Sequence, residues 1–313
     1  MESLVLDIAE VRIGVRLCGE AEKGAALCRH YFRGFESGKD AVDAELLVVT
    51  PERPEDAGEP VKGSPPLTAE RRLPIEEAVE WIGERALNDP AFPLSEGTVA
   101  ACGLGGVLLF DGESGGAGRM FLLSPGRRRF QPLYRLLWMY AAQDLGERGI
   151  GLVHGAALAH EGRGFLFLGD SGAGKSTLAR NAPGFDVLSD DSPALFRGRE
   201  AFRIAATPFC QAHMEEGFSP GAHAIAADLE GLYFLERDGT GLIDPVPPVD
   251  ALSRILQRSV HFFAFLSPRA RAGLFDLIHD LCRRVPVFSA RFSGEQEMTR
   301  FMAAKERRDH GQG

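Results

Sequence analysis

A stretch of nine residues near the middle of the chain contains a phosphate-binding pattern. The residues are Gly169, Asp170, Ser171, Gly172, Ala173, Gly174, Lys175, Ser176 and Thr177, of which the first eight fit G-x-x-x-x-G-K-[ST] in full. The glycines let the backbone curl so that successive N–H groups face inward, and the start of a following helix adds partial positive charge. In such a loop Lys175 reaches the β- and γ-phosphates, the Ser176 hydroxyl ligates Mg²⁺, and Thr177 adds a phosphate contact. The motif predicts a nucleoside triphosphate site.

The elements around this loop match what the motif requires. The apolar run Phe165–Leu168 comes directly before it and is typical of a buried strand, while Leu178–Arg180 continues as the first turn of a helix. Strand, loop and helix in this order are the context in which the pattern binds phosphate.

Two adjacent carboxylates, Asp190 and Asp191, follow the loop at an informative distance. Asp190 lies fifteen positions after Lys175, which leaves room for a short helix, a turn and the strand Phe185–Leu188. If that strand runs parallel to the strand before the loop, the aspartates lie at the same sheet edge as the phosphate site. One carboxylate can then hold Mg²⁺ while the other accepts a proton from an attacking hydroxyl.

Each of these candidates also has a purely structural interpretation. Asp190 and Asp191 precede Ser192-Pro193, and a pair of carboxylates in such a position can simply cap a turn. His154 lies in the predicted strand 152–159, one strand before Phe165–Leu168, and can be either a site residue or a structural hydrogen-bonding group.

Composition excludes several classes of partner. The 313-residue chain has a formal charge of −9 and 44% hydrophobic residues, so nucleic acid and anionic membranes are not expected partners. Its five cysteines show no C-x-x-C spacing, which favours reduced thiols in a cytoplasmic protein over disulfides or a zinc site. Neither a signal peptide nor an apolar run of membrane-spanning length is evident.

The remaining pattern predicts a mixed α/β fold. Period-two alternation over 4–17 and the apolar run 44–49 predict strands, and Gly106–Asp111 with Met120–Leu123 predicts a hairpin. Predicted helices cover 20–33, 75–87, 132–145, 249–257 and 270–283. Further strands are predicted at 152–159, 194–196, 202–205, 232–235 and 285–292, and 51–72 is predicted to be a loop.

At these residues the chain resembles the HPr kinase/phosphorylase family, whose catalytic domain shares the nucleotide-binding fold of phosphoenolpyruvate carboxykinase. The resemblance rests on His154-Gly155, the loop 169–177 and Leu188–Asp191, in that order and with short spacing. The stretches Ala206–Phe209 and Val285–Phe288 are similar to HPr-kinase-related proteins of peptide natural-product gene cassettes. The similarity covers about residues 150 to 295.

The resemblance implies a specific set of roles. The loop 169–177 would bind ATP, and Ser176 and Asp191 would hold Mg²⁺. Asp190 would be the general base, supported by His154, and the resemblance leaves open which of the two aspartates is the base and which is the metal ligand. The implied activity is transfer of the γ-phosphate to a Ser or Thr hydroxyl of a peptide or protein, and a homo-oligomer is a further possibility.

The expected organisation is an N-terminal α+β region over 1–126, a kinase-like domain of the HPr kinase type over 127–300, and a polar tail over 301–313. The N-terminal region is a candidate for substrate or partner binding. Two other functions stay open: a small-metabolite P-loop kinase, and a non-enzymatic ATP-binding partner or chaperone in a peptide biosynthetic pathway. The small-metabolite kinase fits less well for two reasons. Such kinases begin at the strand before the phosphate loop, whereas here the strand 152–159 precedes it as the first half of a hairpin, and they typically carry Asp-x-Asp rather than two adjacent aspartates.

Overall fold

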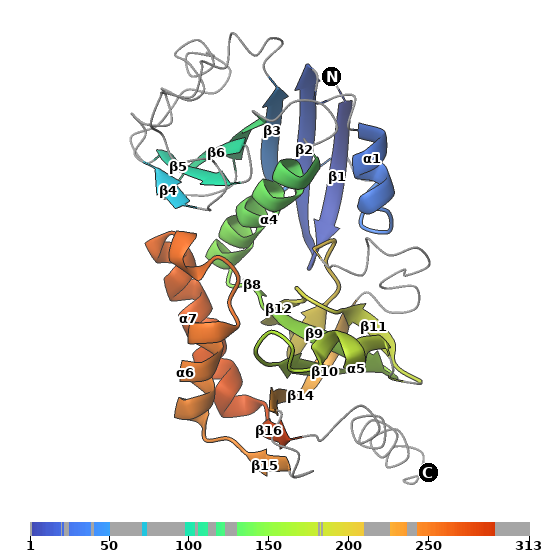
Figure 1. The fold of residues 1–313 in the computed structure, drawn as a ribbon, viewed down its shortest axis with the longest axis vertical. Coiled ribbons are helices and arrows are strands. Elements are labelled where there is room, and N and C mark those ends of the chain that lie inside the picture. The colour runs from blue at the N-terminus through green and yellow to red at the C-terminus, as the bar shows by residue number, and fades with distance from the viewer. Residues whose placement is uncertain are drawn as a thin grey trace. The chain divides into compact units, whose positions relative to one another are not determined.

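The chain folds into two compact units. A computed structural model describes residues 2–19, 21, 25–38, 41–50, 71–73, 98–103, 106–111, 117–122, 130–180, 182, 184–209, 226–236 and 243–291. The first unit comprises Met1–Glu147 with Ala264–Ala270, and the second comprises Arg148–Phe263 with Arg271–Gly313. Each unit is built on its own mixed β-sheet (Figure 1).

The sheet of the first unit has the strand order β1-β2-β3-β7-β6-β5-β4 over the described residues. These strands are β1 (Glu2–Ile8), β2 (Val11–Gly19), β3 (Ala44–Thr50), β4 (Arg71–Leu73), β5 (Thr98–Gly103), β6 (Gly106–Asp111) and β7 (Ala117–Leu122). The alternating residues over 4–17, predicted as one or two strands, form the two strands β1 and β2, which pair antiparallel. Strands β2, β3 and β7 then run parallel, and β6 pairs antiparallel with β7 as the predicted hairpin.

The described residues of this unit include two helices, α1 (Ala25–Tyr31) and α4 (Phe130–Glu147). Helix α4 packs against β5, β6 and β7 with the apolar stripe that predicted it (Figure 1). The Tyr140 hydroxyl donates to the carbonyl oxygen of Glu45 at 3.0 Å. A Cβ at Gly118 would lie only 2.7 Å from the Tyr140 ring, so glycine in β7 is what admits this side chain.

The second unit holds the candidate site. Its strands are β8 (Gly151–Leu152), β9 (Gly155–His160), β10 (Arg163–Leu168), β11 (Asp186–Ser189), β12 (Ala194–Arg197), β13 (Phe202–Ala205), β14 (Ala226–Glu236), β15 (Ile243–Pro245) and β16 (Val287–Arg291). Over the described residues the order is β11-β9-β10-β14-β13-β12-β8, with β16 beside β14 and β15 beside β16. Its helices are α5 (Lys175–Arg180), α6 (Pro248–Arg258) and most of α7 (Pro268–Arg284), whereas the short 3₁₀ helix η4 (Phe263–Phe265) spans the point in the chain where the second unit gives way to the first.

Strand directions decide which chain segments meet at one sheet edge. Strand β9 pairs antiparallel with both β10 and β11, so β10 and β11 run in the same direction. On its other side β10 pairs parallel with β14, which pairs parallel with β16. The carboxyl ends of β10, β11 and β14 and the amino end of β9 therefore share one edge.

One face of the β10 neighbourhood packs under α5. Phe165 and Phe167 alternate along β10 and join Tyr233, Leu178 and Ala179 in a buried cluster. The rings of Phe167 and Tyr233 stack with centroids 5.2 Å apart. This apolar support fixes the start of α5, and with it the end of the loop 169–177.

The structure differs from the prediction at several places in this unit: β14 begins at Ala226 rather than at residue 232, and β15 was not predicted. The predicted strand 152–159 is interrupted: β8 ends at Leu152 and β9 begins at Gly155, because Val153 forms an isolated bridge with Val260. The predicted strand 285–292 begins only at Val287, because α7 continues to Arg284. The predicted helix 75–87, the tail 301–313 and most of the predicted loop 51–72 lie outside the described residues. No helix in the described part of the chain is long and apolar enough to cross a membrane.

Replacing Gly155 by Ala is expected to destabilise the second unit. The added Cβ would lie 2.7 Å from the Leu168 side chain and 2.8 Å from the carbonyl oxygen of Phe167, and that backbone atom cannot move aside without distorting β10. We expect a loss of about 1–3 kcal/mol in the free energy of unfolding, measured by urea denaturation. Gly38→Ala is the control, because nothing lies within 4 Å of its added Cβ. An unchanged unfolding midpoint for Gly155→Ala would contradict this packing.

Candidate phosphate-binding and metal site

Three chain segments that are separate in the sequence meet at the shared sheet edge. Gly155 at the start of β9 lies opposite Leu168 at the end of β10, and Ala157 lies opposite Ser189 at the end of β11. The backbone N–H of Gly155 also donates to the carbonyl oxygen of Asp191 at 3.0 Å. The loop after β10, the aspartates after β11 and His154 before β9 are thereby brought together.

A cavity of about 260 Å³ opens at this point. Its lining residues are His154, Ser171, Gly172, Gly174, Lys175, Ser176, Thr177, Asp190 and Asp191. Two other residues of the motif, Gly169 and Asp170, line a neighbouring cavity, whereas Ala173 packs against the apolar cluster beneath α5. The predicted phosphate loop, both aspartates and the histidine thus surround one space.

Two glycines of the loop 169–177 adopt backbone conformations that favour glycine. Gly172 and Gly174 have φ values of 78° and 99°, which side chains with a Cβ rarely adopt. The N–H of Ala173 donates to the carbonyl of Asp170 at 3.0 Å, and that of Leu178 to Gly174 at 2.8 Å, where α5 begins. Strand, loop and helix follow one another as the motif requires.

Lys175 is the cation of this cavity and is 6% exposed. Its Nζ donates to the carbonyl oxygens of Gly169 and Asp170 at 2.8 and 3.1 Å. Burial lowers the pKa of the Lys175 ammonium, and the negative charges of Asp191 and Asp170 oppose that shift. A polyanion that entered the cavity would provide stronger acceptors than the two carbonyls and would favour the charged form further.

The turn that carries the aspartates is held by Ser189. Its hydroxyl accepts the N–H groups of Asp191 and Ser192 at 3.3 and 3.0 Å. The Thr207 hydroxyl in turn donates to the carbonyl of Ser192 at 2.5 Å. Asp190 is 5% exposed, and both carboxylates line the cavity. Ser189 therefore caps the turn that carries the two carboxylates.

Two histidines stand beside Asp191. His154 Nε2 lies 3.6 Å from Asp191 Oδ1, and its backbone N–H donates to the carbonyl of Ser259 at 2.7 Å. The His261 ring stacks on His154 with centroids 5.3 Å apart, and its Nε2 lies 3.4 Å from the carbonyl oxygen of Asp191. Burial, followed by the charge of Lys175, lowers the pKa of His154, which favours the neutral imidazole. Sequence reasoning missed His261 because it follows α6, far from the motif in the chain.

The nitrogen and oxygen atoms of His154, Asp191 and His261 could act as ligands of a divalent cation. Ligand atoms of His154, Asp191 and His261 lie within 4.8 Å of one another. Ser176 and Asp191, the metal ligands predicted from the sequence, line the same cavity and offer the oxygen atoms that Mg²⁺ prefers. The neighbouring imidazoles add nitrogen donors that suit Mn²⁺ or another transition metal as well.

Comparison with known proteins gives little independent information. No family model matches the chain, and no curated protein matches it. One similar solved structure is that of the Hpr(Ser) kinase/phosphatase from Coxiella burnetii, with 12% identity over 51% of this chain and 97% of that chain. The TM-score is 0.31, which is too low to establish a common fold or activity.

Loss of the Asp191 carboxylate is expected to weaken divalent-metal binding. Asp191→Ala should reduce the affinity for Mn²⁺ in the presence of ATP by at least about tenfold if the carboxylate is a ligand, because even the loss of an outer-shell group costs about tenfold or more. The measurement is the electron paramagnetic resonance signal of free Mn²⁺. Asp186→Ala is the matched control, because Asp186 lies at the opposite end of β11. Equal Mn²⁺ affinity in the two variants would exclude Asp191 as a ligand.

Proposed function

We propose that the cavity at this sheet edge is the active site of an ATP-dependent kinase. The observation that carries the proposal is the lining of one cavity by a phosphate-loop motif, a buried lysine and two adjacent carboxylates. Phosphoryl transfer needs charge neutralisation around the γ-phosphate, a metal ligand and a base near the attacking hydroxyl. The lining residues supply a group for each task.

The individual roles follow from position and chemistry. The N–H groups of Ser171–Gly174 and the Lys175 ammonium hold the β- and γ-phosphates. Ser176 and Asp191 hold Mg²⁺, which when bound neutralises charge on the β- and γ-phosphates. Asp190 accepts the proton of the attacking hydroxyl, and His154 orients Asp191 from 3.6 Å away.

The proposed acceptor is a Ser or Thr hydroxyl of a peptide or protein. This acceptor class is the one that the resemblance to the HPr kinase family implies. Two alternatives predict different products: a small-metabolite kinase would label a low-molecular-weight acceptor, and an ATP-using partner protein would release phosphate without labelling any acceptor.

The Asp190→Asn variant is expected to lose phosphoryl transfer but to keep its affinity for ATP. The amide cannot accept the hydroxyl proton, so phosphorylation should fall by about 10²–10⁴-fold, whereas the phosphate-binding groups remain. Transfer is measured with γ-labelled ATP and the peptides or proteins encoded beside this gene, and ATP affinity by calorimetry. Asp186→Asn serves as the control for loss of one carboxylate on β11.

The outcomes of this experiment separate the candidate functions. Label on a peptide Ser or Thr that disappears in Asp190→Asn supports the proposed kinase. Undiminished transfer by Asp190→Asn would show that Asp190 is not the base, and phosphate release with no labelled acceptor would favour the ATP-using partner.

A further inference from the structure

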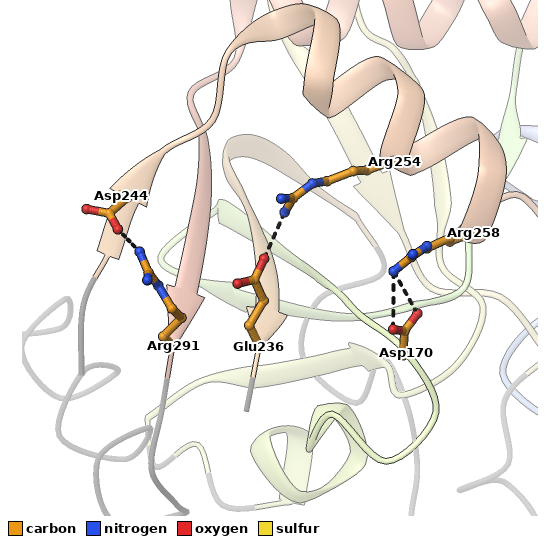
Figure 2. A network of polar contacts seen from close by, with 6 residues as sticks. All are labelled: Asp170, Glu236, Asp244, Arg254, Arg258 and Arg291. Carbon is orange, nitrogen blue, oxygen red and sulfur yellow. Dashed lines mark hydrogen bonds and ion pairs between the residues drawn. The ribbon is translucent and has the colours of Figure 1, made fainter. Parts of the chain in front are cut away.

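A second cavity, of about 280 Å³, adjoins the phosphate loop. It is lined by Gly169 and Asp170, by the end of β14 at Phe234–Glu236, and by Ser259 and three residues of α6, which are Arg254, Gln257 and Arg258. Figure 2 shows the two arginines reaching down from α6 toward the strand end and the loop. The proposed phosphoryl transfer leaves this cavity without a role.

The position of the second cavity follows from the strand order. Asp190 and Asp191 follow β11, on one flank of β10, whereas β14 ends on the other flank. A triphosphate in the loop must turn its γ-phosphate toward the aspartates, because the base and the metal ligand are there. Its other end then points away from them, toward the flank on which Phe234–Glu236 and α6 form the second cavity.

The first cavity is suited to phosphates and metal but not to the rest of a nucleotide. Its described lining consists of glycines and of hydroxyl, carboxylate, ammonium and imidazole groups, with no large aliphatic side chain and no Phe, Tyr or Trp. A base needs flat or apolar surface, and a ribose needs hydrogen-bond acceptors for its hydroxyl groups. These must come from a neighbouring site.

The second cavity offers both kinds of surface. Arg254 lies over the Phe234 ring, with its guanidinium carbon 5.3 Å from the ring centroid. Its Nη1 is 2.8 Å from Glu236 Oε1, and Arg258 Nη1 is 3.2 Å from Asp170 Oδ2 (Figure 2). Guanidinium planes stack on flat bases, and carboxylate oxygens accept hydroxyl groups. Two cations and two carboxylates balance in charge, which suits an uncharged group better than another phosphate.

These ion pairs can rearrange around a ligand. The side chains of Arg254 and Glu236 are 44% and 38% exposed, and those of Arg258 and Asp170 are 66% and 72% exposed. Ion pairs this exposed to water contribute little to stability, so exchanging them for ligand contacts costs little. The third pair in Figure 2, Arg291 with Asp244, joins β16 to β15 and does not line the cavity.

We propose that the second cavity binds the nucleoside end of the nucleotide, with Arg254 and Arg258 against the base and Glu236 and Asp170 accepting ribose hydroxyls. This inference rests on the proposed function, because it requires that the triphosphate occupy the loop 169–177. It adds the prediction that the protein binds ATP more tightly than inorganic tripolyphosphate.

The test compares the affinities of ATP and inorganic tripolyphosphate for a double variant that has the same net charge as the wild-type protein. Glu236→Ala/Arg254→Ala removes one cation and one anion, so the net charge around the phosphates is unchanged. We expect ATP affinity to fall roughly tenfold or more, because stacking is lost, while tripolyphosphate affinity stays the same. Both affinities are measured by calorimetry with Mg²⁺. The matched control is Arg197→Ala/Asp280→Ala, which removes an ion pair between β12 and α7 with similar exposure, 42% and 36%.

Each outcome either supports or overturns the proposed nucleoside site. A selective loss of ATP affinity in the β14–α6 variant supports it. Equal loss for both ligands, no loss for either, or a wild-type protein that binds both ligands equally tightly would overturn it while leaving the phosphate site intact. Lys175→Ala tests that phosphate site separately: unchanged binding of tripolyphosphate would overturn the proposed function itself.

Discussion

The antiparallel strand β9 is the element on which the site depends. Because β9 separates β10 from β11 and pairs antiparallel with both, two strands that run in the same direction end at the edge where β9 begins. The phosphate loop, the aspartates and His154 are each one or two residues beyond a strand end. Gly155 makes this junction possible, since any Cβ there would collide with the end of β10.

Electrostatics explains why the loop and the aspartates belong together. A buried ammonium is costly, and Lys175 is partly compensated by two backbone carbonyls and by the charges of Asp191 and Asp170. Lys175 and Asp191 face the same cavity, where a phosphate and a divalent cation would each add an opposite charge. In the proposed kinase, Lys175 and Asp191 therefore complement a ligand that combines negatively charged phosphates with a positively charged divalent cation.

The sequence predicted those parts of the site that follow one motif. Gly172, Gly174 and Lys175 have a fixed spacing with a local conformational cause, and the short interval to Asp190 restricts the intervening elements to one helix and one strand. His261, Arg254 and Arg258 were missed because they come from a segment about 80 residues further along the chain and match no pattern. The break before β9 also escaped prediction, since it results from the pairing of Val153 with Val260. Likewise, alternation predicted β1 and β2, but the parallel pairing of β2 with β3 and of β3 with β7 depends on tertiary structure.

Covalent labelling with an acyl-phosphate derivative of ATP tests the central claim most directly. The chain contains five lysines, at positions 23, 39, 62, 175 and 305, so the modified position identifies the phosphate site. If the cavity binds the triphosphate, mass spectrometry will find the acyl group on Lys175, and excess ATP with Mg²⁺ will suppress the labelling. Acylation of the other lysines alone, or labelling of Lys175 that ATP does not suppress, would contradict the account.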